Sequence, residues 1–577
     1  MSARCIMVLG TASGAGKSWL TTALCRHYAR QGLKVAPFKA QNMSNNARVV
    51  ASAKGQGEIG SAQYFQALAA KAEPDVRMNP LLLKPEADTH SQVVLLGEVS
   101  EALSHTPWHE RSDKVWPAIA AALDELIAEN DVVVIEGAGS PAEINLMHSD
   151  IVNLRVARHA KATCLLVTDI DKGGAFAHLY GTWALLPPQD QQRIQGFVLN
   201  KFRGDASLLA PAPEMLQQLT GVPTVAVLPM WWQHGLPEED GVFDDRSRAK
   251  GAVTQTVAVI AYPRISNLDE FQPLKNVPGL RLLWARSPAD LAGLQASDWV
   301  ILPGSKHTSS DLAWLRQQGL DAAVTRHAQQ GGTVLGICGG LQMLGEALID
   351  TQGIDGNAPG LGLLPLVTQF APDKTVKKTQ ARFGQVQGPW AALSGVEVAG
   401  YEIHHGQTQG HSAMLAGGAV LHQVMPGLAW QSGDGRVLGT YLHGLLECQA
   451  VMQALFGAWV PTLESVFEGL ADYIEQHFES RVLAQWAAAW GPARICRMEL
   501  KIVVYSKSAC PQCESAKMVL KTKSLPFEEI KIDSEEERMA FYEKCGPSVR
   551  QMPQIFINDQ RVGGLAGLQA ALAQLGR

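Results

Sequence analysis

Short apolar runs rich in β-branched residues recur along the first part of the chain and alternate with stretches of helical periodicity. Five such runs, each bounded by Gly, Pro or Asp, predict strands at 5–9, 132–135, 164–168, 196–200 and 224–228. Strands that alternate with helices predict a mostly parallel sheet with helices on both faces. A polar segment without apolar period follows at 237–250. We therefore expect an α/β domain over residues 1–245 and a linker or exposed loop after it.

A second series of apolar runs predicts a separate sheet, with strands at 257–261, 299–302, 333–338 and 437–441. Residues 455–490 are rich in Ala, Glu and Leu and predict helices. We expect a second α/β domain at 251–450 and a helical tail or linker at 451–495.

The C-terminal part predicts a third, smaller α/β domain. Gly and Pro interrupt the helical sequence pattern at 491–494. A compact βαβ pattern follows, with a strand at 500–505, a helix near 513–523 and a strand at 554–558. We place this domain at 498–577.

Composition narrows the possible partners. Hydrophobic residues make up 46% of the 577 and charged residues 18%, which excludes a disordered or collagen-like chain. With 49 basic and 55 acidic residues, the net charge of -6 provides no positive field for nucleic acid. No apolar run approaches the about 18 to 20 residues of a membrane span, so we expect a cytoplasmic protein. The nine scattered cysteines disfavour a secreted disulfide framework.

A glycine-rich segment from Gly10 to Ser18 follows the first predicted strand and opens a helix, which is the context of a phosphate-binding loop. Glycines such as Gly14 and Gly16 let backbone N–H groups converge on phosphate oxygens, and Lys17 adds a positive charge. The Ser18 hydroxyl is a candidate Mg²⁺ ligand. The loop is one residue longer than the usual GxxxxGK[ST] spacing when counted from Gly10. It predicts an ATP site, with a chance glycine-rich turn as the alternative.

Polar side chains follow other predicted strands. Glu136 lies at the sheet edge where doubly wound folds bind ligands, so it is a second candidate Mg²⁺ ligand or else a turn cap. Asn200 is either a contact to the nucleotide base or an ordinary strand-end residue. The segment 36–46, which includes Gln41 and Asn42, is a candidate substrate or phosphate loop, with a solvated turn as the alternative.

Cys338 lies in a G-x-C-x-G pattern between an apolar strand and a helix. Such a turn exposes the sulfur, and the helix N-terminus lowers the thiol pKa and offers the N–H of Gly339 to an oxyanion. Cys338 is the predicted nucleophile, with a buried structural cysteine as the alternative. His443 ends a strand about a hundred residues downstream and is a candidate base, in competition with His404 and His405.

Cys510 and Cys513 form the one closely spaced cysteine pair of the sequence. No second CxxC or Cys/His set is present to complete a tetrahedral zinc site. We interpret the pair as redox-active, with Cys510 as the attacking thiolate at a helix start and Cys513 as the resolving thiol. A pair that only caps a helix is the alternative.

The phosphate-binding loop and the segments 37–43, 78–85, 136–145 and 169–176 resemble the cobyric acid synthase family of cobalamin biosynthesis, over roughly residues 1–490. The N-terminal domain of that family is similar to dethiobiotin synthetase, which shares the longer loop spacing. The resemblance implies that ATP and glutamine are used to amidate the b, d, e and g carboxylates of adenosylcobyrinic acid a,c-diamide.

The second domain is similar to the class I, triad-type glutamine amidotransferases. This resemblance favours His443 as the base, Gly304 as a second oxyanion donor and Gln342 as a contact to glutamine. In the wider family a Glu follows the His by two residues, but Leu445 occupies that position here and the nearest carboxylate is Glu447. The third member of the triad stays open, and a Cys/His dyad is the alternative.

Residues 498–577 resemble glutaredoxin, which has a thioredoxin fold. The resemblance implies a cis-proline turn at Met552 and Pro553. It also implies a glutathione groove formed by Lys507, Gln512, Met552, Pro553 and Gly564. The Asp that often follows the Gly-Gly of the family is absent, since this chain continues with Leu565.

Two sites of these kinds in one chain favour an amidotransferase. A carboxylate resists amidation until ATP converts it into an acyl phosphate, and a thiolate that hydrolyses glutamine supplies the ammonia locally. One alternative is the related cobyrinic acid a,c-diamide synthase, which the 37–43 loop disfavours. Another is a P-loop ATPase switch protein with a non-catalytic amidotransferase-like module, and a third is a thiol oxidoreductase with an inert N-terminal scaffold.

Overall fold

The computed structural model describes residues 3–52, 54–87, 90–232, 234–237, 252–458, 461–487, 502–522, 525–545, 551–557 and 560–574. The predicted linker at 237–250, apart from residue 237, and the predicted break at 491–494 lie outside these ranges. The chain divides into two compact units, Met1–Ala489 and Trp490–Arg577. Across the described ranges, no helix has the length and apolar character needed to cross a bilayer.

A six-stranded sheet, parallel throughout, forms the centre of the first part of unit one. In spatial order its strands are β12 (Thr224–Pro229), β11 (Ile194–Phe202), β10 (Thr163–Asp169), β1 (Arg4–Gly10), β9 (Val132–Glu136) and β2 (Val35–Phe38). The five predicted strands are confirmed, most of them extended by one or two residues. Their carboxyl ends share one edge, which gathers the residues that follow each strand.

Alternate residues of each strand pack against opposite layers of helices. On β1, Ile6 and Val8 join one buried cluster, whereas Met7 and Leu9 join the other. The first layer contains α1 (Lys17–Arg30), α2 (Ser61–Ala69), α15 (Leu463–His477) and α16 (Ser480–Ala487). The second contains α4 (Trp108–Glu129), α5 (Leu154–His159), α6 (Ala175–Leu185) and α8 (Ala212–Thr220), with the short α3 (Glu101–Ser104) and α7 (Pro188–Gln191) nearby in sequence.

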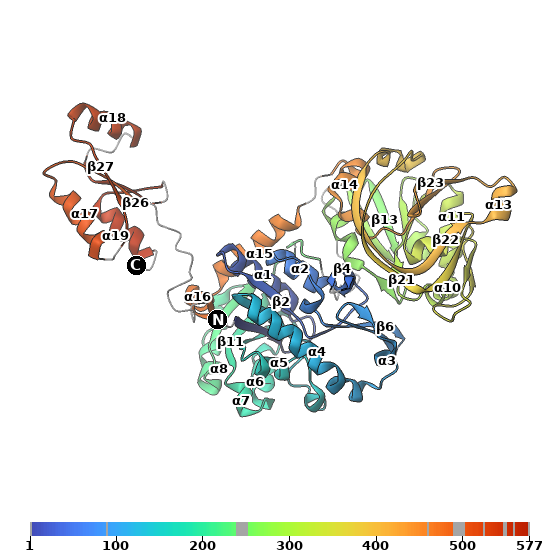
Figure 1. Ribbon diagram of the computed structural model, residues 1–577, viewed down its shortest axis with the longest axis horizontal. Helices are drawn as coiled ribbons and strands as arrows, with labels where there is room; N and C mark the ends of the chain where they lie inside the picture. The colour runs from blue at the N-terminus through green and yellow to red at the C-terminus, as the bar shows by residue number, and fades with distance from the viewer. Residues whose placement is uncertain are drawn as a thin grey trace. The chain divides into compact units, whose positions relative to one another are not determined.

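The helical tail of the sequence prediction returns to the first sheet. The orange α15 packs along the blue α1 (Figure 1), where the buried Arg26 forms an ion pair with Glu464 at 2.7 Å. The helices α15 and α16 follow the second sheet in the sequence, but they belong to the helical layer that covers the first sheet.

A small sheet and a hairpin interrupt the first domain between β2 and α4. The sheet contains β3 (Gln41–Met43), β6 (Leu81–Ala87), β7 (His90–Leu95) and β8 (Glu98–Val99), and the hairpin is formed by β4 (Ala47–Ser52) and β5 (Gly55–Gly60). These strands are not among those predicted from the sequence.

A seven-stranded sheet forms the second part of unit one. In spatial order it contains β15 (Leu280–Ala285), β13 (Gln255–Ile260), β16 (Trp299–Leu302), β18 (Thr333–Ile337), β25 (Val437–Thr440), β24 (Ala429–Ser432) and β23 (Leu421–Met425). The first five are parallel and the last two antiparallel. The four predicted strands of this sheet are confirmed, and Cys338 follows directly on β18.

A long hairpin and several helices surround this second sheet. The hairpin, which the sequence did not predict, pairs β21 (Leu366–Arg382) with β22 (Glu397–Gly410) and contacts β4 and β5 of the first part. The helices are α9 (Pro288–Leu291), α10 (Thr308–Gln317), α11 (Leu320–Gln329), α12 (Gly339–Leu344), α13 (Ser412–Ala416), α14 (Gln449–Phe456) and the 3-10 helices η5 (Leu268–Asn276) and η7 (Leu445–Glu447). The short strands β14 (Ile265–Ser266) and β17 (Gly304–Ser305) pair with each other, as does β19 (Ala347–Ile349) with β20 (Ala358–Pro359).

The described residues of unit two form a four-stranded mixed sheet and three helices. Its strands, in spatial order, are β27 (Glu528–Lys531), β26 (Ile502–Ser506), β28 (Gln554–Ile557) and β29 (Gln560–Gly563), of which only β26 and β27 are parallel. The helices are α17 (Pro511–Thr522), α18 (Glu535–Cys545) and α19 (Leu565–Gln574). The predicted strands of this domain are confirmed over their described residues, and residues 500, 501 and 558 lie outside the described ranges.

Candidate active sites

The predicted phosphate-binding loop connects β1 to α1. Gly14 and Gly16 adopt positive φ angles of 72° and 101°, and a Cβ on Gly16 would collide with the side-chain amide of Asn200. The ammonium group of Lys17 donates to the carbonyl oxygens of Ala12 at 3.0 Å and Gly139 at 3.2 Å. The loop is therefore a glycine-dependent cradle around a lysine at a helix N-terminus, which suits a polyphosphate.

Glu136 is buried beside this loop at the end of β9. It accepts hydrogen bonds from Ser18 Oγ at 2.8 Å, Lys39 Nζ at 2.9 Å and Gln66 Nε2 at 2.5 Å. Burial alone would raise the pKa of Glu136, but the charge of Lys39 and these hydrogen bonds lower it overall. An ionised carboxylate next to a hydroxyl is a donor set that fits Mg²⁺.

Lys39 and Gln66 were not selected as site residues from the sequence. Lys39 lies within the polar segment 36–46, which was the available signal, whereas Gln66 lies inside α2 and has no motif around it.

Residues from β10 and β11 also contact the loop. Asn200 Nδ2 donates to the carbonyl oxygen of Ala15 at 2.9 Å. Lys201 Nζ donates to Gly14 O at 2.8 Å and to the Asp169 carboxylate at 3.1 Å. Asn200 therefore stabilises the loop conformation, and its contact to a nucleotide base stays a prediction.

The predicted substrate residues Gln41 and Asn42 lie on β3. The buried Asn42 donates to Gln63 Oε1 at 3.1 Å, and Gln41 is half-buried. Their contact to a substrate stays a prediction.

Cys338 occupies a sharp turn between β18 and α12, with φ 51° and ψ -107°. A positive φ at a residue with a side chain is strained, and such strain is found where a nucleophile is presented. Glycines on both sides allow the turn: a Cβ on Gly336 would lie 2.5 Å from Leu344, and one on Gly340 would collide with the carbonyl of Leu302. The structure thus has the backbone geometry of a nucleophile elbow at Cys338.

His443 lines the same cavity as Cys338, whose Sγ donates to the carbonyl oxygen of Ile403 at 3.5 Å. It hydrogen-bonds to Glu270 on η5, a carboxylate that was not among the predicted site residues. Its Nδ1 donates to Glu270 Oε1 at 3.2 Å, while Glu270 Oε2 accepts from the N–H of Gly444 at 3.1 Å. Burial alone would lower the pKa of His443, but Glu270 and Cys338 raise it to about 10. The imidazole is therefore held protonated and oriented, as the acid–base partner of a thiolate must be.

The two competing histidines have other partners. Both ring nitrogens of His404 face acceptors, Gly406 O at 2.8 Å and the Glu402 carboxylate at 3.1 Å. Burial is the main cause that lowers the pKa of His405 to about 4, and its Nδ1 donates to a backbone carbonyl. The geometry around Cys338 therefore favours His443, and Glu447 is paired elsewhere, with Arg48.

The backbone at Gly304 and Gly339 lies close to this pair. A Cβ on Gly304 would lie 2.9 Å from His443 Cε1 and 2.5 Å from Ser266 Oγ, and one on Gly339 would lie 2.8 Å from Ser305 N. The positions thus require glycine, consistent with backbone donors that approach a substrate oxygen.

A cavity of about 90 Å³ opens at Cys338 and His443. Gln342 lines it and accepts a hydrogen bond from Thr308 Oγ1 at 2.9 Å. Residues of the nucleotide-binding part, including Glu86, line its other side. The cavity has both the thiol and the amide group that binding of glutamine would require.

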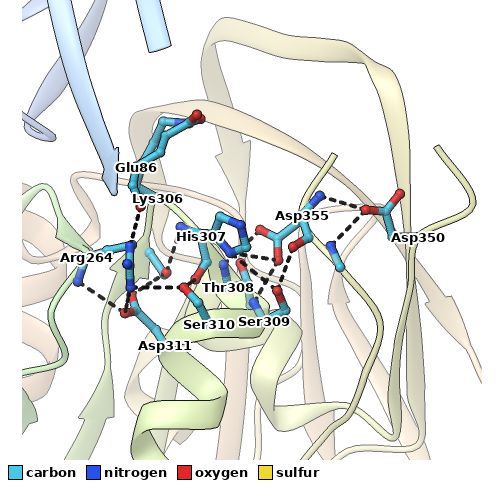
Figure 2. A network of polar contacts seen from close by, with 12 residues as sticks. Glu86, Arg264, Lys306, His307, Thr308, Ser309, Ser310, Asp311, Asp350 and Asp355 are labelled. Carbon is cyan, nitrogen blue, oxygen red and sulfur yellow. Dashed lines mark hydrogen bonds and ion pairs between the residues drawn. The ribbon is translucent and has the colours of Figure 1, made fainter. Parts of the chain in front are cut away.

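A polar network (Figure 2) includes several residues that line the cavity, among them Lys306, Thr308 and Asp355. Asp311 accepts from Ser305 Oγ at 2.6 Å, which fixes the residue after Gly304. Asp355 accepts from the N–H groups of Thr308 and Ser309 at 2.8 and 2.7 Å, which fixes the first turn of α10.

In unit two, Cys510 and Cys513 form a disulfide at the start of α17. Both are buried, the N–H of Cys513 donates to Cys510 Sγ at 3.2 Å, and Cys510 Sγ lies 3.8 Å from Met552 O. The Met552–Pro553 peptide is cis, which confirms that prediction. A Cβ on Gly564 would lie 3.5 Å from Pro553 O, so these predicted groove residues adjoin one another.

Lys507 and Gln512 are exposed on either side of Cys510 in the sequence. Glutathione binding at these positions stays a prediction.

Fold and sites together define a class: a P-loop nucleotide-binding domain joined to a triad-type glutamine amidotransferase, with a thiol–disulfide domain after them. Family models agree. Residues 6–233 match the CobQ/CobB/MinD/ParA nucleotide binding domain, residues 256–451 the CobB/CobQ-like glutamine amidotransferase domain, and residues 502–562 glutaredoxin. These matches confirm the predicted fold class, and they make the chain a nucleotide-binding, glutamine-dependent enzyme with a glutaredoxin domain.

Two curated proteins of high sequence identity show the family to which the chain belongs. Cobyric acid synthase of Albidiferax ferrireducens is 76% identical over 489 residues, which cover 84% of this chain and 99% of that protein. Cobyric acid synthase of Polaromonas naphthalenivorans is 76% identical over 484 residues, with the same coverages. The chain belongs to the cobyric acid synthase family of cobalamin biosynthesis.

Among solved structures, glutaredoxin 1 from Francisella tularensis, complexed with cacodylate, is 32% identical. It covers 14% of this chain and 99% of its own, with a TM-score of 0.13.

Proposed function

We propose that the chain converts adenosylcobyrinic acid a,c-diamide into adenosylcobyric acid, so that the b, d, e and g carboxylates of the corrinoid become carboxamides. The observation that carries the proposal is one compact unit that contains both the Cys338–His443–Glu270 arrangement and the phosphate-binding loop with its buried Glu136. The names of the two curated relatives support the choice of a corrinoid substrate.

Ammonia is released from glutamine at Cys338. The thiolate attacks the amide carbon, and the N–H groups of Gly304 and Gly339 stabilise the oxyanion. His443, protonated and held by Glu270, donates its proton to the departing nitrogen, so that ammonia leaves and a thioester remains. Water then attacks the thioester carbon and gives a proton to His443, and glutamate leaves as the thiolate is regenerated. Gln342 orients the substrate.

The acceptor carboxylate attacks the γ-phosphorus of ATP and forms an acyl phosphate and ADP. Ammonia then attacks the acyl carbon, phosphate leaves, and the nitrogen loses a proton to give the amide. Lys17, Lys39 and the N–H groups of the loop, including those at Gly14 and Gly16, stabilise the charge on the phosphoryl group.

Ser18 and Glu136 would hold Mg²⁺, which supplies further compensation of the phosphate charge. We place Asn200 near the base, and Gln41 and Asn42 near the acceptor. These assignments rest on position along the sheet edge and on the resemblance stated above.

Unit two is proposed to be a glutathione-linked thiol–disulfide oxidoreductase. The Cys510 thiolate attacks a disulfide substrate, and either Cys513 or glutathione resolves the mixed disulfide, with reduced glutathione as the source of electrons. Lys507, Gln512, Met552, Pro553 and Gly564 form the proposed groove for glutathione.

The decisive experiment supplies the diamide and ATP with either glutamine or ammonium, and compares wild type with Cys338→Ala. Products made from ¹⁴N- and ¹⁵N-labelled nitrogen sources differ by one mass unit for each nitrogen transferred, so mass spectrometry counts the amidations. We expect complete amidation by wild type with either source, and by Cys338→Ala with ammonium alone. An unchanged corrinoid with both sources would refute the proposal and favour the P-loop switch protein.

A further inference from the structure

Arg48 lies on β4, between the nucleotide-binding and amidotransferase parts of unit one, and only 3% of its surface is exposed. Its guanidinium forms ion pairs with Asp269 and Glu447, which both belong to the amidotransferase part; Nη1 donates to Glu447 Oε2 at 2.8 Å. The rings of Phe65 and Tyr401 lie against it, each with its centroid 5.0 Å from the guanidinium carbon. A buried cation of this kind needs all its partners in place.

Each amidotransferase partner of Arg48 adjoins the catalytic pair. Asp269 directly precedes Glu270, which holds His443. The ring of Tyr401 stacks on the His443 ring at 5.3 Å, and the two residues exchange backbone hydrogen bonds of 2.9 and 3.3 Å. Glu447 belongs to the short 3-10 helix that follows His443. Arg48 therefore contacts the residues whose backbone and ring contacts orient His443.

On its other side, Arg48 connects to the ATP site through α2. Phe65 packs on the guanidinium, and the next residue, Gln66, donates to the Glu136 carboxylate at 2.5 Å. A continuous set of contacts thus joins the candidate Mg²⁺ ligand Glu136 to Arg48.

The backbone around Arg48 is attached to η5 by a reciprocal pair of hydrogen bonds. Asn46 Oδ1 accepts from Leu268 N at 2.9 Å, and Asn267 Oδ1 accepts from Ala47 N at 3.1 Å. Both asparagines are buried. Residues 46–47, which follow the proposed acceptor loop, are therefore held by hydrogen bonds to the start of η5, the helix that contains Glu270.

We propose that Arg48 is a positioning residue through which the nucleotide-binding part orients the Glu270–His443 pair, so that glutamine hydrolysis depends on the state of the ATP site. The proposal rests on the proposed function for its physiological meaning. Without Arg48, Asp269 and Glu447 become uncompensated carboxylates next to Glu270, and their mutual repulsion displaces the carboxylate that holds His443.

The test compares wild type with Arg48→Gln, which removes the charge, and Arg48→Lys, which retains it. Glutamate release from glutamine is measured with and without ATP and corrinoid, and amidation is measured with ammonium. For Arg48→Gln we expect a fall of about tenfold or more in kcat for glutamine, little change in KM, loss of stimulation by ATP and corrinoid, and ammonium-dependent amidation close to wild type. For Arg48→Lys, which retains the charge, we expect a kcat for glutamine between those of wild type and Arg48→Gln.

Lys378→Met is the matched control. Lys378 also joins the two parts, through an exposed ion pair with Glu73 at 3.3 Å, but it does not contact the catalytic pair. Near-normal glutamine hydrolysis by this variant separates positioning from general docking.

Equal losses of glutamine-dependent and ammonium-dependent activity in a folded Arg48→Gln would overturn the inference, as would unchanged glutamine hydrolysis. If Arg48→Gln does not fold by circular dichroism, Glu447→Gln takes its place, because it removes one partner of the guanidinium and should lower kcat for glutamine in the same selective way. Glutamate release does not require the corrinoid, so a wild type that fails to amidate refutes the proposed function without deciding the role of Arg48.

Discussion

Replacement of Glu270 by Gln tests the acid–base assignment at Cys338. The substitution retains the size of the side chain and an oxygen near His443 Nδ1, but it removes the negative charge that helps to keep the imidazole protonated. Burial lowers the pKa of His443, and without the Glu270 charge this effect is no longer offset, so the pKa falls from about 10. We expect slower glutamine hydrolysis and an alkaline limit of activity that moves to lower pH.

The size of the effect follows from the contact between Glu270 and His443. Opposite charges 3.2 Å apart interact by about 5 kcal/mol at an effective dielectric constant of about 20. The net contribution of a hydrogen bond to a charged group is smaller, about 1.5–3 kcal/mol. This corresponds to about one to two pH units in the pKa of His443 and, if the whole contribution acts in the transition state, to about a 10- to 150-fold loss of kcat.

The same contact predicts a pH dependence of stability. Because the folded state raises the pKa of His443 above its ordinary value of 6.5, the pair contributes its full stabilisation below about pH 6.5 and loses it as the pH rises through about 10. Wild type should therefore exceed Glu270→Gln in stability at pH 7 by more than at pH 10.

The assay is glutamate release as a function of pH, with denaturant unfolding of both proteins at pH 7 and pH 10. Ammonium-dependent amidation serves as the control, because it bypasses Cys338. An alkaline limit that does not move in Glu270→Gln, together with kcat within about twofold of wild type, would show that Glu270 neither charges nor orients the histidine.

Four further substitutions test the remaining sites. Glu136→Gln should reduce amidation about 100-fold or more with glutamine and with ammonium alike, since it acts on phosphoryl transfer; a loss with glutamine alone contradicts the assignment. Gly304→Ala places a methyl group 2.9 Å from His443 Cε1 and should lower kcat for glutamine hydrolysis about 100-fold, and a wild-type rate would mean that the wall moves freely. In unit two, Cys510→Ser should abolish glutathione-dependent reduction of a small mixed disulfide whereas Cys513→Ser retains it, and the opposite result would exchange the roles of the two thiols.

The main strands were predictable because parallel strands are buried on both faces. Their sequences are continuous apolar runs, as at β9 and β18, and the turns that follow carry Gly or an acidic residue. The β21–β22 hairpin escaped prediction because it is long and half exposed, with a mixed pattern of charged and apolar residues over 366–410. Its two strands are stabilised by pairing with each other and by contact with β4 and β5. These contacts are not visible in the local sequence pattern.

Candidate site residues can be recognised in the sequence where a proposed role also constrains the backbone. The loop before Lys17 and the turn at Cys338 both require glycines at fixed spacing, so the sequence itself marks them. Glu270 carries no such mark. It lies 173 positions from His443 in the sequence, on a 3-10 helix, and its contact exists only in the folded chain.

The position two residues after His443 does not provide the carboxylate that contacts this histidine. Leu445 is fully buried there, in the core cluster of the amidotransferase part, so a carboxylate at that position would lie among apolar side chains. A Glu in the same loop as the histidine would orient it from within the amidotransferase part alone. Glu270 instead follows Asp269, whose carboxylate pairs with Arg48 of the nucleotide-binding part. The carboxylate that contacts His443 therefore belongs to the same part as the histidine, while its neighbour Asp269 is paired with Arg48 across the contact between the two parts.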